Sequence, residues 1–90
     1  MIIIADSGSS KIDWRLLKTD GGIGQANCPG FNPYYQPIED LKKNIREALV
    51  PVVAEKVTKI FFYGTGVSSQ KNQDVVRSAF LEFFPGAMVE

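Results

Sequence analysis

A carboxylate, a turn of small residues and a lysine follow one another between Asp6 and Lys11, in the order DSGSSK. The glycine and serines offer backbone N–H groups and hydroxyls that can hold phosphate oxygens. Lys11 can add a positive charge, and Asp6 can hold Mg²⁺ directly or through water. We therefore expect a phosphate-binding turn formed by Gly8, Ser9, Ser10 and Lys11, with Asp6 as its metal ligand.

Two other interpretations of this turn have to be weighed. Serine, glycine and aspartate are common in ordinary hairpin turns, and composition alone does not separate a phosphate turn from an ordinary one. A Walker-type loop needs two glycines around four residues, followed by Lys and Ser or Thr at the start of a helix. Here one glycine precedes the lysine by three positions and a strand-like run follows, so the sequence excludes that loop.

Length and composition limit the possible functions. Ninety residues allow one small domain, and a hydrophobic content of 44%, with six Phe, three Tyr and one Trp, is enough for a core. Ten basic and ten acidic residues cancel without forming a basic cluster, so we expect no nucleic-acid partner. The absence of histidine excludes a Ser–His–Asp triad and a His-ligated zinc site.

The same composition bears on the compartment. The single cysteine, Cys28, cannot form an internal disulfide, which fits a reducing cytoplasm. No apolar run approaches the length of a membrane span, and the N-terminal apolar run lacks a basic segment before it. We therefore expect a cytoplasmic protein with no signal peptide and no membrane partner.

Three strands joined by short turns are predicted to open the chain. The apolar, largely β-branched run 1–4 indicates a central strand that delivers Asp6 to its end. A second strand is expected over 11–19 and a third over 23–28. Asp20-Gly21-Gly22 between them is a strong hairpin signal, because these residues accept the positive φ of tight turns. The three strands should form an antiparallel meander.

Helices and parallel strands are expected in the second half. Apolar residues at helical spacing predict a helix over 37–55, with a kink or break near Pro51. A strand is expected over 57–63, a helix over 69–84 capped by Ser68 or Ser69, and a fifth strand after Gly86. Right-handed crossovers would add the last two strands in parallel. The sequence thus predicts an α/β fold with a mixed sheet and the order β-β-β-α-β-α-β.

Two loops carry further candidate ligand groups. The segment 29–37, PGFNPYYQP, contains three prolines and a glycine and presents Phe31, Asn32, Tyr34 and Tyr35. An amide and aromatic rings on a rigid loop suit a sugar or another small polar ligand, whereas the alternative is that the rings cover the edge of the sheet. The turn GTG at 64–66 ends a strand before a helix, which is where open α/β sheets bind ligands.

This order of elements, with DSGSSK between the first two strands, resembles the amino-terminal half-domain of the actin-like ATPase superfamily. That ribonuclease H-like fold is shared by sugar kinases, Hsp70-type chaperones and actin. The first phosphate motif of the superfamily looks like D-x-G-[GS]-[TS], often followed by a basic residue. The positions that match it are Asp6, Gly8, Ser9, Ser10 and Lys11, with serine in place of the usual threonine at residue 10.

The resemblance is greatest to N-acetylglucosamine kinases and to the BadF/BadG/BcrA/BcrD ATPases, which activate reductases and dehydratases. It implies a cytoplasmic enzyme that uses ATP and Mg²⁺. Gly30 and Asn32 match the loop after the third strand in that group. Asn32 would then bind the substrate, an amino sugar in the kinases, together with Gly64 and Gly66 of the glycine-rich turn.

The resemblance also implies that residues 1–90 are an amino-terminal fragment. Members of the group have two such domains, and their catalytic base lies in a later part of the chain. The fragment alone is therefore expected to be inactive. Four aspartates are predicted to be solvated surface groups and not substitutes for the base: Asp13, Asp20, Asp40 and Asp74.

Three functions stay open on the sequence alone. The chain could supply the first phosphate loop of a sugar kinase, or belong to an ATPase activator of a reductase or dehydratase, or act as a non-catalytic half-domain that self-associates. Activators hold an iron–sulfur cluster between subunits through cysteines, and Cys28, within a strand, is a poor candidate for that role. The uncovered edge of a short fifth strand predicts a homodimer.

Overall fold

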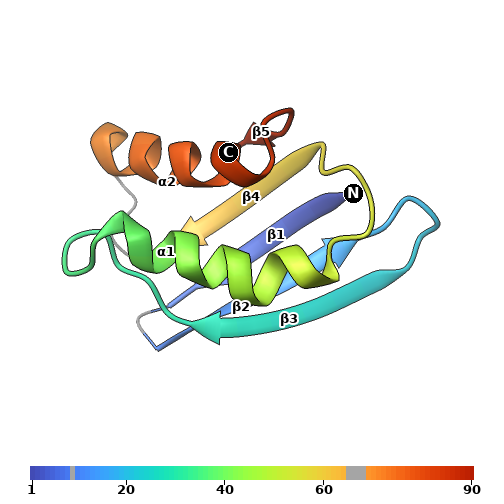
Figure 1. Cartoon of the computed structure of the whole chain (residues 1–90), viewed down its shortest axis with the longest axis horizontal. Helices are drawn as coiled ribbons and strands as arrows, with labels where there is room; N and C mark the ends of the chain where they lie inside the picture. Colours follow the sequence, from blue (N-terminus) through green and yellow to red (C-terminus); the bar gives the residue numbers. More distant parts are fainter. Residues whose placement is uncertain (9, 65–68) are drawn as a thin grey trace.

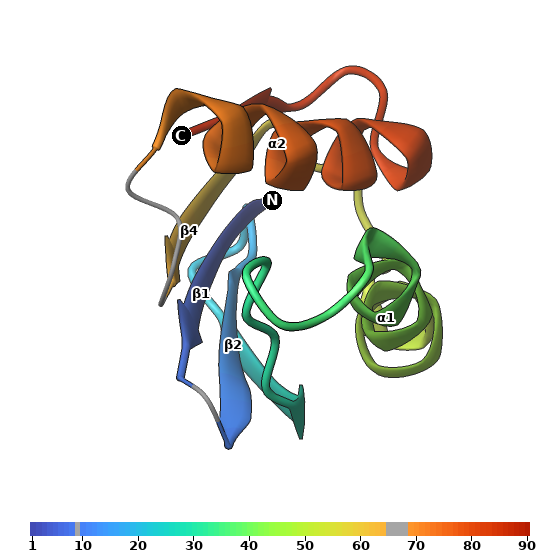
Figure 2. The same ribbon diagram turned by 90° about the vertical axis from the view of Figure 1, so that its left-hand side faces the viewer.

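Five strands form one mixed sheet, and both helices cover the same face of it (Figure 1; Figure 2). The computed structural model describes residues 1–8, 10–64 and 69–90. The antiparallel meander consists of β1 (Ile2–Ser7), β2 (Lys11–Leu17) and β3 (Ile23–Pro29). On its other side β1 pairs in parallel with β4 (Lys59–Gly64), and β4 pairs in parallel with β5 (Met88–Val89). The predicted α/β order and the mixed sheet are confirmed.

The first helix is shorter than the predicted range 37–55. α1 spans Ile38–Asn44 and continues as a π-helical turn over Ile45–Leu49 and a 3₁₀ turn over Val50–Val52. Pro51 has no N–H to donate to the helical ladder, and its ring disfavours the α-helical carbonyl spacing. The chain therefore changes its hydrogen-bond spacing before this residue and leaves the helix soon after it, so the predicted break near Pro51 is confirmed.

The second helix, α2, spans Gln70–Phe83. The Oγ of Ser69 accepts a hydrogen bond from the backbone N–H of Asn72 at 3.2 Å, which is the geometry of an N-cap. Of the two caps that the sequence offered, Ser69 is the one in place, and Ser68 lies outside the described residues. None of the described helices has the length and the apolar character needed to cross a membrane.

The core lies between the sheet and the two helices. Strand alternation buries Ile3, Ala5 and Ser7 of β1 on the helix side. Trp14 of β2 is fully buried and meets the ring of Phe80 of α2 edge-on, with centroids 5.9 Å apart. The same alternation directs Asp6 and its neighbours on β2 to the opposite, helix-free face. The packed side thus fixes the position of the polar residues on the open side.

The strand boundaries differ from the predictions by one or two residues. β2 ends at Leu17 because the N–H of Lys18 already donates to the carbonyl of Gly22, 2.9 Å away, and closes the turn. β3 extends to Pro29, which is tolerated because β3 is an edge strand and the missing N–H deprives no neighbour of a bond. β4 begins at Lys59, two residues later than predicted, although Val57 is buried before it.

Candidate functional site

The DSGSSK stretch forms the hairpin between β1 and β2. The N–H of Gly8 donates to the carbonyl of Lys11 at 2.8 Å and closes the turn. Asp6, Ser10 and Lys11 are exposed, whereas Ser9 lies outside the described residues. The N–H of Gly8 is therefore engaged within the chain. In the described part of this turn, the groups open to solvent belong to the side chains and to the backbone around Ser10.

Glycine is not required at position 8 by the fold itself. Among the described glycines only Gly21 has a positive φ, of 90°. A Cβ atom placed on Gly8 would lie 3.6 Å from the carbonyl oxygen of Lys11, which is an ordinary contact distance. Neither backbone conformation nor packing within the chain thus explains this glycine.

Two carboxylates lie side by side on the open face of the sheet. Asp6 of β1 is paired directly with Asp13 of β2, so their Cβ atoms are about 4.5–5.5 Å apart by the geometry of antiparallel strands. The Nζ of Lys11 lies 3.5 Å from the Oδ2 of Asp13. Asp13, predicted as a solvated surface group, has a partly exposed side chain that pairs with Lys11. The sequence could have indicated that Asp6 and Asp13 are neighbours, because both aspartates stand two residues from the Gly8–Lys11 closure.

Three segments meet at this edge of the sheet. In the strand registers, Ser7 lies beside Gly64 at the end of β4, and Lys11 lies opposite Pro29 at the end of β3. The buried Oγ of Ser7 also donates to the carbonyl of Phe31 at 3.4 Å and joins the hairpin to the loop after β3. The structure therefore brings the hairpin, Gly64 and the start of the Asn32 loop together, while Gly66 lies outside the described residues.

Asn32 organises the loop in which it stands. Its Oδ1 accepts from the N–H of Tyr34 at 2.9 Å, and its own N–H donates to the Oε1 of Gln36 at 2.9 Å. Its carbonyl accepts from the N–H groups of Tyr35 and Gln36, both at 3.0 Å. The residue is buried, and its carboxamide oxygen is engaged in the turn. Of its side-chain atoms, Nδ2 is the one for which no protein partner is recorded within the described chain.

The aromatic rings of this loop differ in their exposure to solvent. Phe31 is buried in the core, as the edge-covering interpretation requires for that ring. Tyr34 and Tyr35 are 62% and 85% exposed. A hollow of about 630 Å³ lies between the loop and the start of α2. Residues that line it include Phe31, Pro33, Tyr34, Lys71, Asn72 and Val75.

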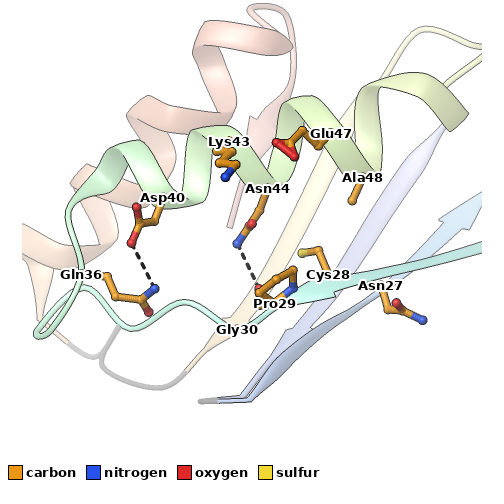
Figure 3. A pocket seen from close by; sticks show the side chains of 10 residues that line it. All are labelled: Asn27, Cys28, Pro29, Gly30, Gln36, Asp40, Lys43, Asn44, Glu47 and Ala48. Carbon is orange, nitrogen blue, oxygen red and sulfur yellow. Dashed lines mark hydrogen bonds between the residues drawn. The ribbon is translucent and has the colours of Figure 1, made fainter.

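A second cavity was not anticipated from the sequence. It has a volume of about 510 Å³ and lies between the end of β3 and the polar side of α1 (Figure 3). Two hydrogen bonds fix its polar walls: Asn44 Nδ2 donates to the carbonyl of Pro29 at 3.0 Å, and Gln36 Nε2 donates to Asp40 Oδ2 at 3.2 Å. We call it the β3–α1 groove. Tertiary packing of α1 beside β3 creates it, and local sequence carries no signal for such packing.

The charged and sulfur-containing side chains of the described residues do not form a metal-binding cluster. In the described part of the chain, no three His, Cys, Asp or Glu residues are grouped so that they could hold a metal ion. The Sγ of Cys28 accepts a hydrogen bond from Trp14 Nε1 at 3.3 Å. Burial raises the pKa of the Cys28 thiol above its ordinary value, although the hydrogen bond from Trp14 acts in the opposite direction. This cysteine is therefore a neutral thiol at pH 7.

Comparison with known proteins identifies a close structural counterpart. No protein-family model matches the sequence. A search of curated proteins also gives no match. Among solved structures, the chain is similar to the crystal structure of a “putative N-acetylglucosamine kinase” from Porphyromonas gingivalis, with a TM-score of 0.82 and 27% sequence identity. The chain has the fold of a sugar-kinase half-domain.

The match covers nearly all of the present chain but only part of the Porphyromonas gingivalis protein. The alignment covers 99% of the present chain and 33% of the Porphyromonas gingivalis chain. The half-domain thus spans one third of the length of that protein. The resemblance to the sugar kinases stated from the sequence is confirmed at the level of the half-domain, and the activity of a whole kinase is taken up as a proposal below.

Proposed function

We propose that this chain is the phosphate-binding half-domain of an ATP-dependent sugar kinase acting on an amino sugar. The observation that carries the proposal is the meeting of three segments at one edge of a kinase-like sheet: the Asp6–Lys11 hairpin, Gly64 and the Asn32 loop. Residues 1–90 would form a single domain of that enzyme, and the opposing wall of the cleft and the catalytic base would come from elsewhere in the kinase.

The hairpin would hold the phosphates of ATP. Phosphoryl transfer depends on positioning and on stabilisation of the charge on the moving phosphoryl group. Lys11 is exposed and can supply a positive charge, and the hydroxyls of Ser9 and Ser10 can donate to phosphate oxygens. A glycine at position 8 leaves the edge of the hairpin free of a side chain, so that a phosphate can approach the backbone. This last point gives a reason for a glycine that the fold does not require.

The donor set at the hairpin suits Mg²⁺. Magnesium is usually bound through one or two carboxylates together with substrate phosphates and water. Asp6 is exposed, and its carboxylate has no recorded ion pair within the described residues, while Asp13 lies directly opposite. Asp6 would hold the metal directly or through water. When bound with ATP, the metal supplies neutralisation of charge on the phosphates.

The loop after β3 would contact the sugar. Asn32 holds the loop in shape through Oδ1, which leaves its Nδ2 as the group that could donate to a sugar oxygen. The exposed ring of Tyr34 lines the hollow beside α2 and offers an aromatic surface to the apolar side of a sugar ring. Gly64, at the end of β4, and Gly66, which lies outside the described residues, are proposed to contribute to the same substrate site.

The alternative function, an ATPase activator of a reductase or dehydratase, is not favoured by any contact of the described chain. Its iron–sulfur cluster would need an accessible thiolate, whereas Cys28 is a half-buried neutral thiol bonded to Trp14. A cytoplasmic location and a homodimer remain predictions that accompany the kinase proposal.

The test is a chimera in which residues 1–90 replace the matching third of the Porphyromonas gingivalis protein, with the parent protein assayed alongside. We expect ATP-dependent phosphorylation of N-acetylglucosamine. Asn32→Ala should raise KM for the sugar by roughly tenfold to a hundredfold, the cost of about 1–3 kcal/mol for an unpaired polar group. The KM for ATP should stay unchanged.

Two outcomes would contradict the proposal. A chimera that melts cooperatively but transfers no phosphate to any amino sugar would exclude the kinase function. Loss of thermal stability in Asn32→Ala with an unchanged KM for the sugar would restrict Asn32 to organising its loop. Tyr35→Ala is the matched control, because Tyr35 is exposed on the same loop but is not part of the hollow's lining.

A further inference from the structure

The sheet ends in two edges of unequal length. At one edge β5 is two residues long, whereas at the other β3 runs for seven residues from Ile23 to Pro29. β3 pairs with β2 on its inner side, and no strand of the described chain pairs with its outer side. The homodimer predicted from the sequence was assigned to the edge of the fifth strand. The structure offers a longer edge at β3.

The register shows which backbone groups of β3 point outward. The N–H of Lys18 donates to the carbonyl of Gly22, so the even-numbered residues of β3 exchange hydrogen bonds with β2. The N–H and C=O groups of Ile23, Gln25 and Asn27 therefore point away from the sheet. The carbonyl of Pro29 has the same orientation, and it accepts a hydrogen bond from Asn44 Nδ2 outside the sheet, which agrees with this assignment.

This edge lacks the features by which proteins usually protect a free strand. Charged side chains, bulges and prolines within an edge strand discourage pairing with another chain. β3 reads IGQANCP and carries no charged residue, and its proline stands at the end. The β3–α1 groove borders the carboxyl-terminal half of the strand, so there is open space on the helix side beside this half of β3 (Figure 3).

We propose that a second copy of this chain pairs with the outer edge of β3, antiparallel and about a two-fold axis at Gln25. In this register Gln25 lies opposite its own counterpart, and Ile23 of each copy lies opposite Asn27 of the other. The three outward residues of each strand then form about six backbone hydrogen bonds. A two-fold interface requires one self-complementary surface, which this register provides.

The properties of the chain favour a second copy as the occupant. No charged side chains of the two strands meet in this register, and the net charge of the chain is zero, so two copies do not repel each other. On the helix side Gly24 lies opposite Ala26 of the other copy, and these small residues allow close approach. Ile23, now 63% exposed, gains contacts at the interface. This interface is independent of the proposed kinase function.

The experiment is analytical ultracentrifugation of the 90-residue chain at micromolar concentrations. We expect the wild-type chain to dimerise. Gln25→Lys should weaken the dimer at least about tenfold, because it brings two ammonium groups into directly opposite positions. Met88→Lys is the matched control, since Met88 is an exposed strand residue at the other edge, and it should leave the dimer unchanged.

A second measurement makes the result independent of folding effects in the variants. Hydrogen exchange of the wild-type chain should show that the amides of Gln25 and Asn27 become protected as the concentration rises, while the amides of β5 do not change. A wild-type chain that stays monomeric would overturn the proposal. The same holds if the β3 edge of such a monomer binds unrelated extended peptides instead of a second copy. A dimer dissociated by Met88→Lys but not by Gln25→Lys would overturn it in favour of the β5 edge.

Discussion

The two hairpins of the meander differ in how far the chain itself explains their residues. In the turn between β2 and β3, Gly21 has a φ of 90°, and the Oδ1 of Asp20 accepts from the N–H of Gly22 at 2.8 Å. In the turn between β1 and β2, the φ of Gly8 is not positive, and the carboxylate of Asp6 has no hydrogen bond or ion pair with another described residue. The same residue types thus serve the backbone in one hairpin and face solvent in the other.

This difference separates a structural turn from the turn that we propose binds a ligand. Asp20 and Gly21 satisfy local needs, a hydrogen bond and a left-handed conformation, so their types follow from the hairpin alone. Asp6 and Gly8 satisfy no comparable need among the described residues, and we propose that an external partner is the reason for them and for Lys11. The β1–β2 and β2–β3 turns contain similar residue types, and their internal hydrogen bonds distinguish them.

The largest effect is expected from matched changes of the two aspartates in the chimera with the Porphyromonas gingivalis protein. Asp6→Asn should lower kcat by at least about a hundredfold, or roughly 3 kcal/mol, because the carboxylate would no longer serve the metal. Asp20→Asn should leave kcat within about twofold. Steady-state assays at saturating Mg·ATP measure both values. Equal losses in the two variants would remove the distinction between the hairpins.

For the two glycines, the larger loss of folding stability is expected in the β2–β3 turn, at Gly21, and not at Gly8. In the 90-residue chain, Gly21→Ala should lower the free energy of unfolding by about 1–2 kcal/mol, the cost of placing a Cβ atom in the left-handed region. Gly8→Ala should change it by less than about 0.5 kcal/mol, because the new Cβ atom meets only ordinary contacts. Urea denaturation measures both. Gly8→Ala should instead weaken the binding of Mg·ADP, and a larger loss of stability at Gly8 than at Gly21 would contradict this assignment.

The sequence predicted much of this architecture and less of the site. Alternation in the strands and the turn residues Asp20–Gly22 were enough for the meander, because these signals are local. The predicted helix 37–55 ends as an α-helix at Asn44, and its last helical turn ends at Val52, because the hydrogen-bond spacing changes through a π and a 3₁₀ turn around Pro51. The Lys11–Asp13 contact along β2 and the hydrogen bonds of Asn32 within its own turn are local, so the sequence could have indicated them. The β3–α1 groove and the burial of Asn32 depend on tertiary packing, for which the local pattern carries no signal.

The smallest effect is expected at Asp13, and its sign should depend on magnesium. Asp13 pairs with Lys11 in the hairpin, and exposed pairs are worth at most about 1 kcal/mol. Without Mg²⁺, Asp13→Asn should strengthen ADP binding by about two- to fivefold, because Lys11 is released and a negative charge is removed. With Mg²⁺ the variant should bind ADP more weakly than the wild-type chain. Titration calorimetry under both conditions checks this, and the same sign in both would exclude a shared role with Asp6.

The most direct test of the account is an NMR titration of the 90-residue chain with Mg·ADP, followed through its backbone amides. The account predicts low-millimolar binding, with chemical-shift changes concentrated at residues 6–11 and at Gly64. Residues 18–22, the hairpin of the same meander, should not change. Lys11→Gln should reduce the changes, whereas Lys18→Gln, the matched control beside the other turn, should not. Shifts spread equally over the two hairpins, or their absence at millimolar Mg·ADP, would contradict the assignment of the Asp6–Lys11 hairpin as the phosphate site.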